Sequence, residues 1–82
     1  MNNDAVDVQV RQVAADVFNL PLPRVTRQTS PESVGNWDSL KHLNFVLALE
    51  AAFGFPLEPE EIEKIRTVGA AIDLVRAKVT SR

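Results

Sequence analysis

The 82-residue sequence lacks cysteine altogether and contains a single histidine. Without thiolates, neither a disulfide framework nor a cysteine-ligated metal site is available, and one imidazole gives a structural zinc too few ligands. We therefore expect no bound metal. The longest apolar run, Phe45 to Leu49, is far shorter than the roughly 20 residues that span a bilayer. No charged-then-apolar leader opens the chain. These absences predict no membrane insertion and a cytoplasmic location.

The short length limits the possible functions. A chain of 82 residues can form one modest core, with no room for an enclosed catalytic cleft. We therefore expect a single domain over residues 1–82 that acts as a monomer and is not an enzyme. The composition, 45% hydrophobic and 24% charged, is typical of folded globular chains rather than disordered ones.

The net charge of −2 is unevenly distributed along the chain. Residues 38–65 contain six acidic and two basic residues, a net charge of −4, which leaves +2 for the remainder. A partner of this segment should therefore be basic. Nucleic acid is a poor candidate, because the basic residues are scattered instead of forming a stripe interleaved with aromatic residues.

The spacing of apolar residues predicts an all-α fold, a small four-helix bundle with three main helices and one short helix. The first helix should start after Asn3 or Asp4 and end near Asn19. A long first loop then follows as far as Trp37, with a short turn expected where Ser30 precedes a proline. The inward residues of the first helix and the anchors of the loop are expected to be Val6, Val10, Val13, Ala14, Val17, Phe18, Val25 and Val34.

The other helices have clear start and stop signals. Asp38 should cap the second helix, and Gly54 should end it just after Phe53. A short third helix is predicted over Pro59–Ile65, and a fourth, capped by Thr67, over Val68–Val79. The inward residues predicted for these two helices are Ile62, Ile65, Val68, Ala71, Ile72, Val75 and Val79.

The second helix has two apolar stripes, although one bundle can bury only one completely. The predicted core stripe consists of Phe45, Val46, Leu49, Ala52 and Phe53. Leu40, Leu43 and Leu47 form the other stripe, which begins beside Ser39. The long loop could fold back over Leu40 and Leu43, whereas we expect Leu47 to be exposed. An exposed apolar stripe with a charged rim is typical of a transient docking surface.

The segment Asp38-Ser39-Leu40 resembles the attachment motif of the acyl carrier protein family. Further matches at the same spacing are Ala48-Leu49-Glu50 through Phe53, Glu60-Glu61-Ile62-Glu63-Lys64-Ile65, Thr67-Val68 and Ala70-Ala71-Ile72-Asp73. The resemblance implies that Ser39 carries a 4′-phosphopantetheine arm donated by coenzyme A, with Asp38 and Leu40 beside it. It also implies a non-catalytic carrier that presents acyl or aminoacyl thioesters to partner enzymes.

The resemblance implies further roles for residues outside the motif. The partners would be a phosphopantetheinyl transferase and an acyl- or aminoacyl-activating ligase, a synthase or an acyltransferase. Partner enzymes would contact Leu43, Leu47, Glu50, Glu60 and Glu61, and an acyl chain could enter among Phe45, Leu49, Ile62 and Leu74. Because Phe45 and Ile62 are bulky, we expect short or polar cargo.

The sequence also departs from the usual pattern of fatty-acid carriers. Lys41, His42 and Asn44 occupy positions where those carriers commonly have acidic residues. Acidic residues are instead concentrated at Glu50 and from Glu58 onward. We therefore interpret the chain as a carrier of a specialised biosynthetic pathway.

Two other functions remain open at this point. One is an unmodified helical adaptor that binds another protein through Leu43, Leu47 and the acidic third helix. The other is a small hydrolase in which His42 activates Ser39, although no acidic residue is evident to orient the imidazole. A structural His42, hydrogen-bonded to the long loop, is the simpler interpretation. Trp37 should pack on the end of the bundle, and contact with the arm is its second possible role.

Overall fold

The computed structural model describes residues 2–35 and 37–80, with side chains from Ala5 onward. Helices and turns account for the regular structure of these residues, so the all-α prediction is confirmed. The elements are α1 (Asn2–Phe18), the 3₁₀ turn η1 (Leu22–Arg24), α2 (Pro31–Val34), α3 (Ser39–Phe53), α4 (Pro59–Lys64) and α5 (Val68–Thr80).

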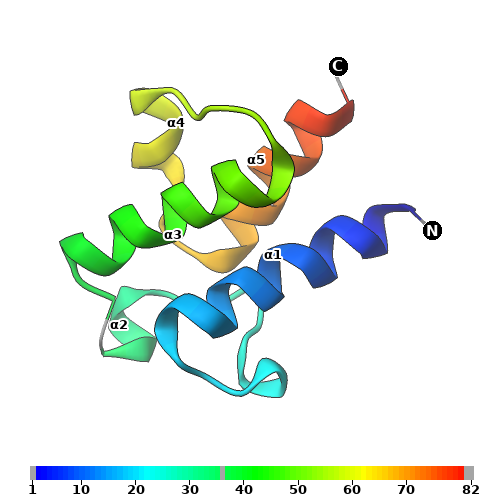
Figure 1. The fold of residues 1–82 in the computed structure, drawn as a ribbon. Coiled ribbons are helices and arrows are strands. Elements are labelled where there is room, and N and C mark those ends of the chain that lie inside the picture. Colours follow the sequence, from blue (N-terminus) through cyan, green and yellow to red (C-terminus); the bar gives the residue numbers. More distant parts are fainter. Residues whose placement is uncertain (1, 36, 81–82) are drawn as a thin grey trace.

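The three main helices form the body of the molecule (Figure 1). Helix α1 packs against both α3 and α5. It lies beside α3 and runs in the opposite direction, and the short α4 crosses above α3 (Figure 1). The long connection between α1 and α3 passes along one side of the bundle and contains η1 and α2. This arrangement leaves one flank of α3 without a neighbouring helix.

Both ends of α3 follow from single residues. The Asp38 carboxylate accepts a hydrogen bond from the Lys41 backbone N–H at 2.9 Å, which satisfies one of the unpaired donors of the first turn. At the other end Gly54 adopts φ +78°, the left-handed conformation that glycine reaches without steric cost, and its N–H donates to the carbonyl of Glu50. The sequence therefore determines where the serine-bearing helix starts and stops.

The start of α5 is held by the long connection. The N–H groups of Val68 and Gly69 donate to the carbonyl oxygens of Thr29 and Arg27, each at 2.9 Å. The Thr67 hydroxyl caps the next free donor, on Ala70, at 3.0 Å, as predicted. These bonds satisfy donors that have no partner within the helix and fix the connection against α5.

The core is continuous from α1 through the connection to α3 and α5. Three aromatic rings form its centre: the centroid of Phe18 lies 4.5 Å from that of Trp37 and 5.4 Å from that of Phe45. Each large apolar side chain buried in this way stabilises the fold by about 1.5–3 kcal/mol. The buried apolar residues are Val10, Ala14, Ala15, Phe18, Val25, Trp37, Phe45, Val46, Leu49, Leu57, Ile65, Val68, Ala71, Ile72 and Val75.

Two residues predicted to face inward are exposed. Ala52 lies at the edge of the core stripe of α3, where a small deviation in angle turns a side chain to solvent. Val79 is 41% exposed in the last turn of α5, because helical spacing does not show how far along the stripe a neighbouring helix extends. The turn expected after Ser30 forms the single turn of helix α2, and η1 was not predicted.

Two further sequence predictions concern membrane insertion and metal binding. Among the helices described, none is long and apolar enough to cross a membrane. Likewise, residues 2–35 and 37–80 contain no group of three or more potential ligands, from histidine, cysteine and carboxylate side chains, that could hold a metal ion.

The approach of the connection to α5 can be tested at Gly69. A Cβ atom placed there would lie 2.9 Å from the Arg27 carbonyl oxygen, a distance that real Cβ atoms essentially never show. Glycine-to-alanine changes inside helices normally stabilise, by up to about 1 kcal/mol. We expect Gly69→Ala instead to destabilise the protein, by about 1–3 kcal/mol in urea unfolding. A stability equal to or above that of the wild type would contradict this close approach.

Candidate functional site

Ser39 is the first residue of α3, directly after the Asp38 cap. Asp38, Ser39 and Leu40 are all exposed, and Leu40 retains 66% of its accessible surface. A serine at the first helical position lies at the positive end of the helix dipole, where an attached anion is stabilised. The side chain is therefore open to a modifying enzyme and suited to carry a phosphate.

A hollow of about 370 Å³ opens beside Ser39 and is broadly exposed to solvent. We refer to it as the Trp37 hollow. Its lining comes from the start of α2 and the start of α3, and includes the serine itself. The residues that line it are Pro31, Trp37, Asp38, Ser39 and His42.

His42 links Trp37 to α4. The indole Nε1–H of Trp37 donates to His42 Nδ1 at 3.0 Å, and His42 Nε2 lies 3.2 Å from the Ile62 carbonyl oxygen. Because Nδ1 accepts, the proton of the neutral ring belongs on Nε2, which then donates to that carbonyl. Both ring nitrogens are thus engaged away from Ser39, as a structural histidine requires. The prediction of a bond to the long loop is confirmed, since Trp37 closes that loop.

The second apolar stripe of α3 is open to solvent. Leu40, Leu43 and Leu47 are 66%, 51% and 53% exposed. The long connection therefore does not fold back over Leu40 and Leu43, and the predicted exposure of Leu47 is confirmed. Such a row of large exposed apolar side chains is suited to contact another protein.

Two of the acidic residues predicted to meet partners are used inside the molecule. The Glu50 carboxylate accepts the Leu57 N–H at 2.8 Å. Glu61 accepts the Glu58 N–H at 2.7 Å and forms an ion pair with Lys78 at 2.9 Å. Both carboxylates therefore hold α4 and the loop before it in place.

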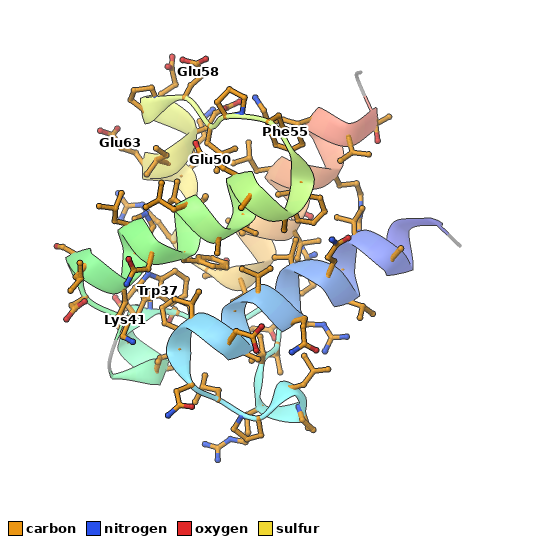
Figure 2. The ribbon with its side chains drawn as sticks, in the orientation of Figure 1. Trp37, Lys41, Glu50, Phe55, Glu58 and Glu63 are labelled. Atoms are coloured by element: carbon orange, nitrogen blue, oxygen red, sulfur yellow. The ribbon has the colours of Figure 1, made fainter. Side chains whose placement is uncertain are left out.

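Other acidic residues face the solvent. Glu58, Glu60 and Glu63 are exposed on and just before α4, and Figure 2 shows Glu58 at the start of that helix and Glu63 on its outer side. Lys41 lies in the first turn of α3, where its ammonium group donates to the Val17 carbonyl at 3.2 Å (Figure 2). The negative charge available to a partner is thus concentrated around α4.

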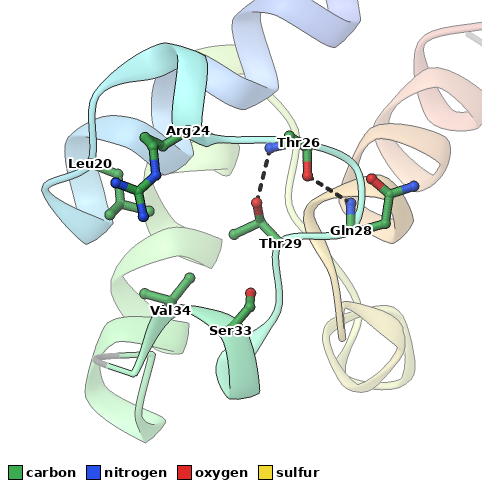
Figure 3. Close-up of a pocket in the computed structure, with 7 residues that line it drawn as sticks. All are labelled: Leu20, Arg24, Thr26, Gln28, Thr29, Ser33 and Val34. Atoms are coloured by element: carbon green, nitrogen blue, oxygen red, sulfur yellow. Dashed lines mark hydrogen bonds between the residues drawn. The ribbon is translucent and has the colours of Figure 1, made fainter.

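The four residues predicted to surround an acyl chain occupy two environments. Phe45 and Leu49 are at most 1% exposed and fill the core, whereas Ile62 and Leu74 are partly buried at its edge. A second hollow, of about 270 Å³, lies elsewhere, on the long connection (Figure 3). It is lined by Leu20, Arg24, Thr26, Gln28, Thr29, Ser33 and Val34, and hydrogen bonds among the threonine and glutamine residues shape its wall.

Comparison with known proteins identifies the family. Residues 8–75 match the family model described as the phosphopantetheine attachment site. The chain is also 31% identical, over 99% of its length and all of the relative, to an acyl carrier protein of Thermosynechococcus vestitus. This chain belongs to the acyl carrier protein family. An acyl carrier protein of Petrotoga mobilis is 32% identical over 96% of this chain and 93% of its own.

Solved structures of carrier proteins share the fold. The solution structure of a holo acyl carrier protein from Geobacter metallireducens has a TM-score of 0.75 at 30% identity, covering 96% of this chain and 86% of that one. The acyl carrier protein of Enterococcus faecalis has a TM-score of 0.72 at 35% identity, with 94% and 98% coverage. The cofactor of this carrier domain is 4′-phosphopantetheine, and an exposed serine at a helix start fits such a group.

The Glu61 carboxylate, whose ion pair with Lys78 holds α4 of this carrier domain to α5, should make stability depend on pH. The hydrogen bond from the Glu58 N–H, followed by that from Lys78, lowers the pKa of Glu61 from its ordinary value of 4.5. A lowered pKa in the folded state stabilises the fold above the unfolded value, and this contribution disappears as the pH falls through the folded value. Acidification below 4.5 should therefore weaken the wild type more than Glu61→Gln.

Thermal unfolding of both proteins at about pH 6 and about pH 3.5 measures this difference. Glu63→Gln is the matched control, since it removes the same charge from an exposed position of the same helix. We expect the Glu63 variant to keep the pH response of the wild type. Equal responses of the wild type and Glu61→Gln would show that ionisation of Glu61 contributes nothing to stability.

Proposed function

We propose that Ser39 is the attachment point of the phosphopantetheine arm and that this protein presents acyl or aminoacyl thioesters to partner enzymes. The observation that carries the proposal is the exposed serine at the first position of α3, directly after its cap and within the matched region. The serine hydroxyl would form a phosphodiester with the arm. The arm supplies the thiol on which the cargo is carried.

The residues around Ser39 support a carrier rather than an enzyme. With both nitrogens of His42 engaged by Trp37 and Ile62, the base that takes the serine proton has to come from the transferase. Asp38 contributes by capping α3, which keeps the serine at the helix end. The first turn of α3 then places its remaining N–H groups and positive dipole end near the phosphate.

We propose that partner enzymes bind the leucine stripe (Leu40, Leu43 and Leu47) together with the exposed acidic residues on and just before α4. Leu43 and Leu47 would enter an apolar recess of the partner, and basic side chains at its rim would meet Glu58, Glu60 and Glu63. Glu50 and Glu61 are less suited, because internal hydrogen bonds already use their carboxylates. The displacement of acidic residues away from the start of α3 supports a dedicated partner set in a specialised pathway.

The proposed cargo is short or polar. Phe45 packs against Phe18 and Trp37, with ring centroids 5.4 and 5.6 Å apart. Opening a cavity for a long chain at this point would disturb the aromatic centre of the core, and such disruption of a close-packed interior is unfavourable. A short acyl or aminoacyl group can instead remain outside on the arm.

The attachment site can be tested by intact mass. Incubation with coenzyme A and a broad-specificity phosphopantetheinyl transferase should add one phosphopantetheine to the wild type and none to Ser39→Ala. Ser33→Ala is the matched control. Ser33 is also exposed, in the short helix α2, but it lies outside the attachment motif. An unmodified but folded wild type would favour the unmodified adaptor, which uses the same exposed leucines.

The docking role of the stripe predicts a kinetic effect at Leu47. Leu47→Ser should lower kcat/KM for arm transfer by about tenfold, because a lost apolar contact of about 1.4 kcal/mol corresponds to that factor. Val8→Ser is the control, since Val8 is 47% exposed on α1, away from the stripe. If both variants react at the wild-type rate in steady-state assays, the transferase does not contact the leucine stripe.

A further inference from the structure

We infer that the Trp37 hollow is the docking site for the pantoyl part of the arm, the branched segment that follows the phosphate. This inference rests on the proposed attachment at Ser39. The serine itself lines the hollow, so the arm begins at its rim. Only the phosphorus, one oxygen and one methylene separate the serine oxygen from the carbon that bears the two methyl groups. Tethering therefore holds this segment next to the hollow at high effective concentration.

The walls of the hollow are fixed before any arm is attached. Trp37 is only 6% exposed and packs on Phe18, and its Nε1–H is bound to His42. His42 is fixed in turn by the Ile62 carbonyl, and its ring lies nearly parallel to the Trp37 indole with a 6.0 Å centroid separation. Little side-chain entropy remains to be lost when a ligand enters a site built in this way.

The wall from α2 is equally well fixed. Pro31 occupies the first position of α2, and Ser30 caps that helix in a reciprocal arrangement with Ser33. The Ser30 hydroxyl accepts the Ser33 N–H at 3.4 Å, while the Ser33 hydroxyl accepts the Ser30 N–H at 2.9 Å. The rigid pyrrolidine ring of Pro31 thus belongs to a turn whose backbone is held at both ends.

The chemistry of the lining matches the pantoyl group. Pro31 and Trp37 offer apolar surface to the two methyl groups. The Asp38 carboxylate accepts the Lys41 N–H through one oxygen, and a carboxylate has capacity for further donors. The hydroxyl and amide N–H that follow the methyl groups are donors of this kind.

The leucine stripe is the other apolar surface near Ser39, but it is less suited to this segment. Leu40 and Leu43 project from an exposed helix flank, with more than half of each side chain in contact with water. A branched group covers less of its surface on such a convex face than in a hollow. Docking in the Trp37 hollow also leaves the stripe available to partner enzymes while the arm is attached.

The test uses uniformly ¹³C- and ¹⁵N-labelled protein loaded with an unlabelled arm, and loading is first verified by intact mass. Isotope-filtered NOE spectra should contain cross-peaks from the two arm methyl groups to the Trp37 indole and the Pro31 ring. Because the chain has one tryptophan, these indole signals are unambiguous. Cross-peaks to Leu40 or Leu43 instead, or no cross-peaks at all, would overturn the inference. Absence of the mass gain would overturn the proposed attachment itself.

Two variants complete the test. Trp37→Phe keeps an aromatic ring in the core but reduces the apolar wall and removes the donor to His42, so the methyl cross-peaks to Pro31 should be lost. Val8→Ala, which shortens an exposed side chain of α1 that does not line the hollow, should leave them unchanged. Retention of the Pro31 cross-peaks in Trp37→Phe, or their loss in Val8→Ala, would overturn the inference.

Discussion

The hydrogen bond from Trp37 to His42 lies where several parts of the chain meet. Trp37 ends the long connection and packs on Phe18 of α1, while His42 reaches the carbonyl of Ile62 in α4. The pair therefore connects α1, the connection, α3 and α4 within one turn of Ser39. Buried and partly buried polar pairs of this kind stabilise a structure only when every member is satisfied, as here.

The long connection has a structural role of comparable weight. Its carbonyl groups cap α5 at Val68 and Gly69, and Val25 is buried in the core. In an 82-residue chain with limited buried area, a connection that contributes to the core and satisfies helix donors replaces elements that a larger domain would supply. This explains why so long a connection is compatible with a defined fold.

Much of the fold could be predicted because side chains encode it directly. The Asp38 cap, Gly54 and the apolar spacing of Phe45, Val46 and Leu49 each gave the correct local structure. The engagement of Glu50 and Glu61 was missed, because their partners are a backbone N–H and a lysine distant in sequence. The bond of His42 to the Ile62 carbonyl was missed for the same reason, since every residue has a carbonyl and no sequence pattern marks which one is reached.

The way in which α4 is attached has a consequence for local opening. Hydrogen bonds and an ion pair from the side chains of Glu50, His42 and Glu61 hold this helix and the loop before it. The buried apolar residue at its end is Ile65. Elements with few buried apolar contacts open at a lower free energy than the core. The backbone amides of α4 should therefore exchange with solvent earlier than those of α1 and α5. The acidic residues on and just before α4 can then adjust to a partner without unfolding of the other helices.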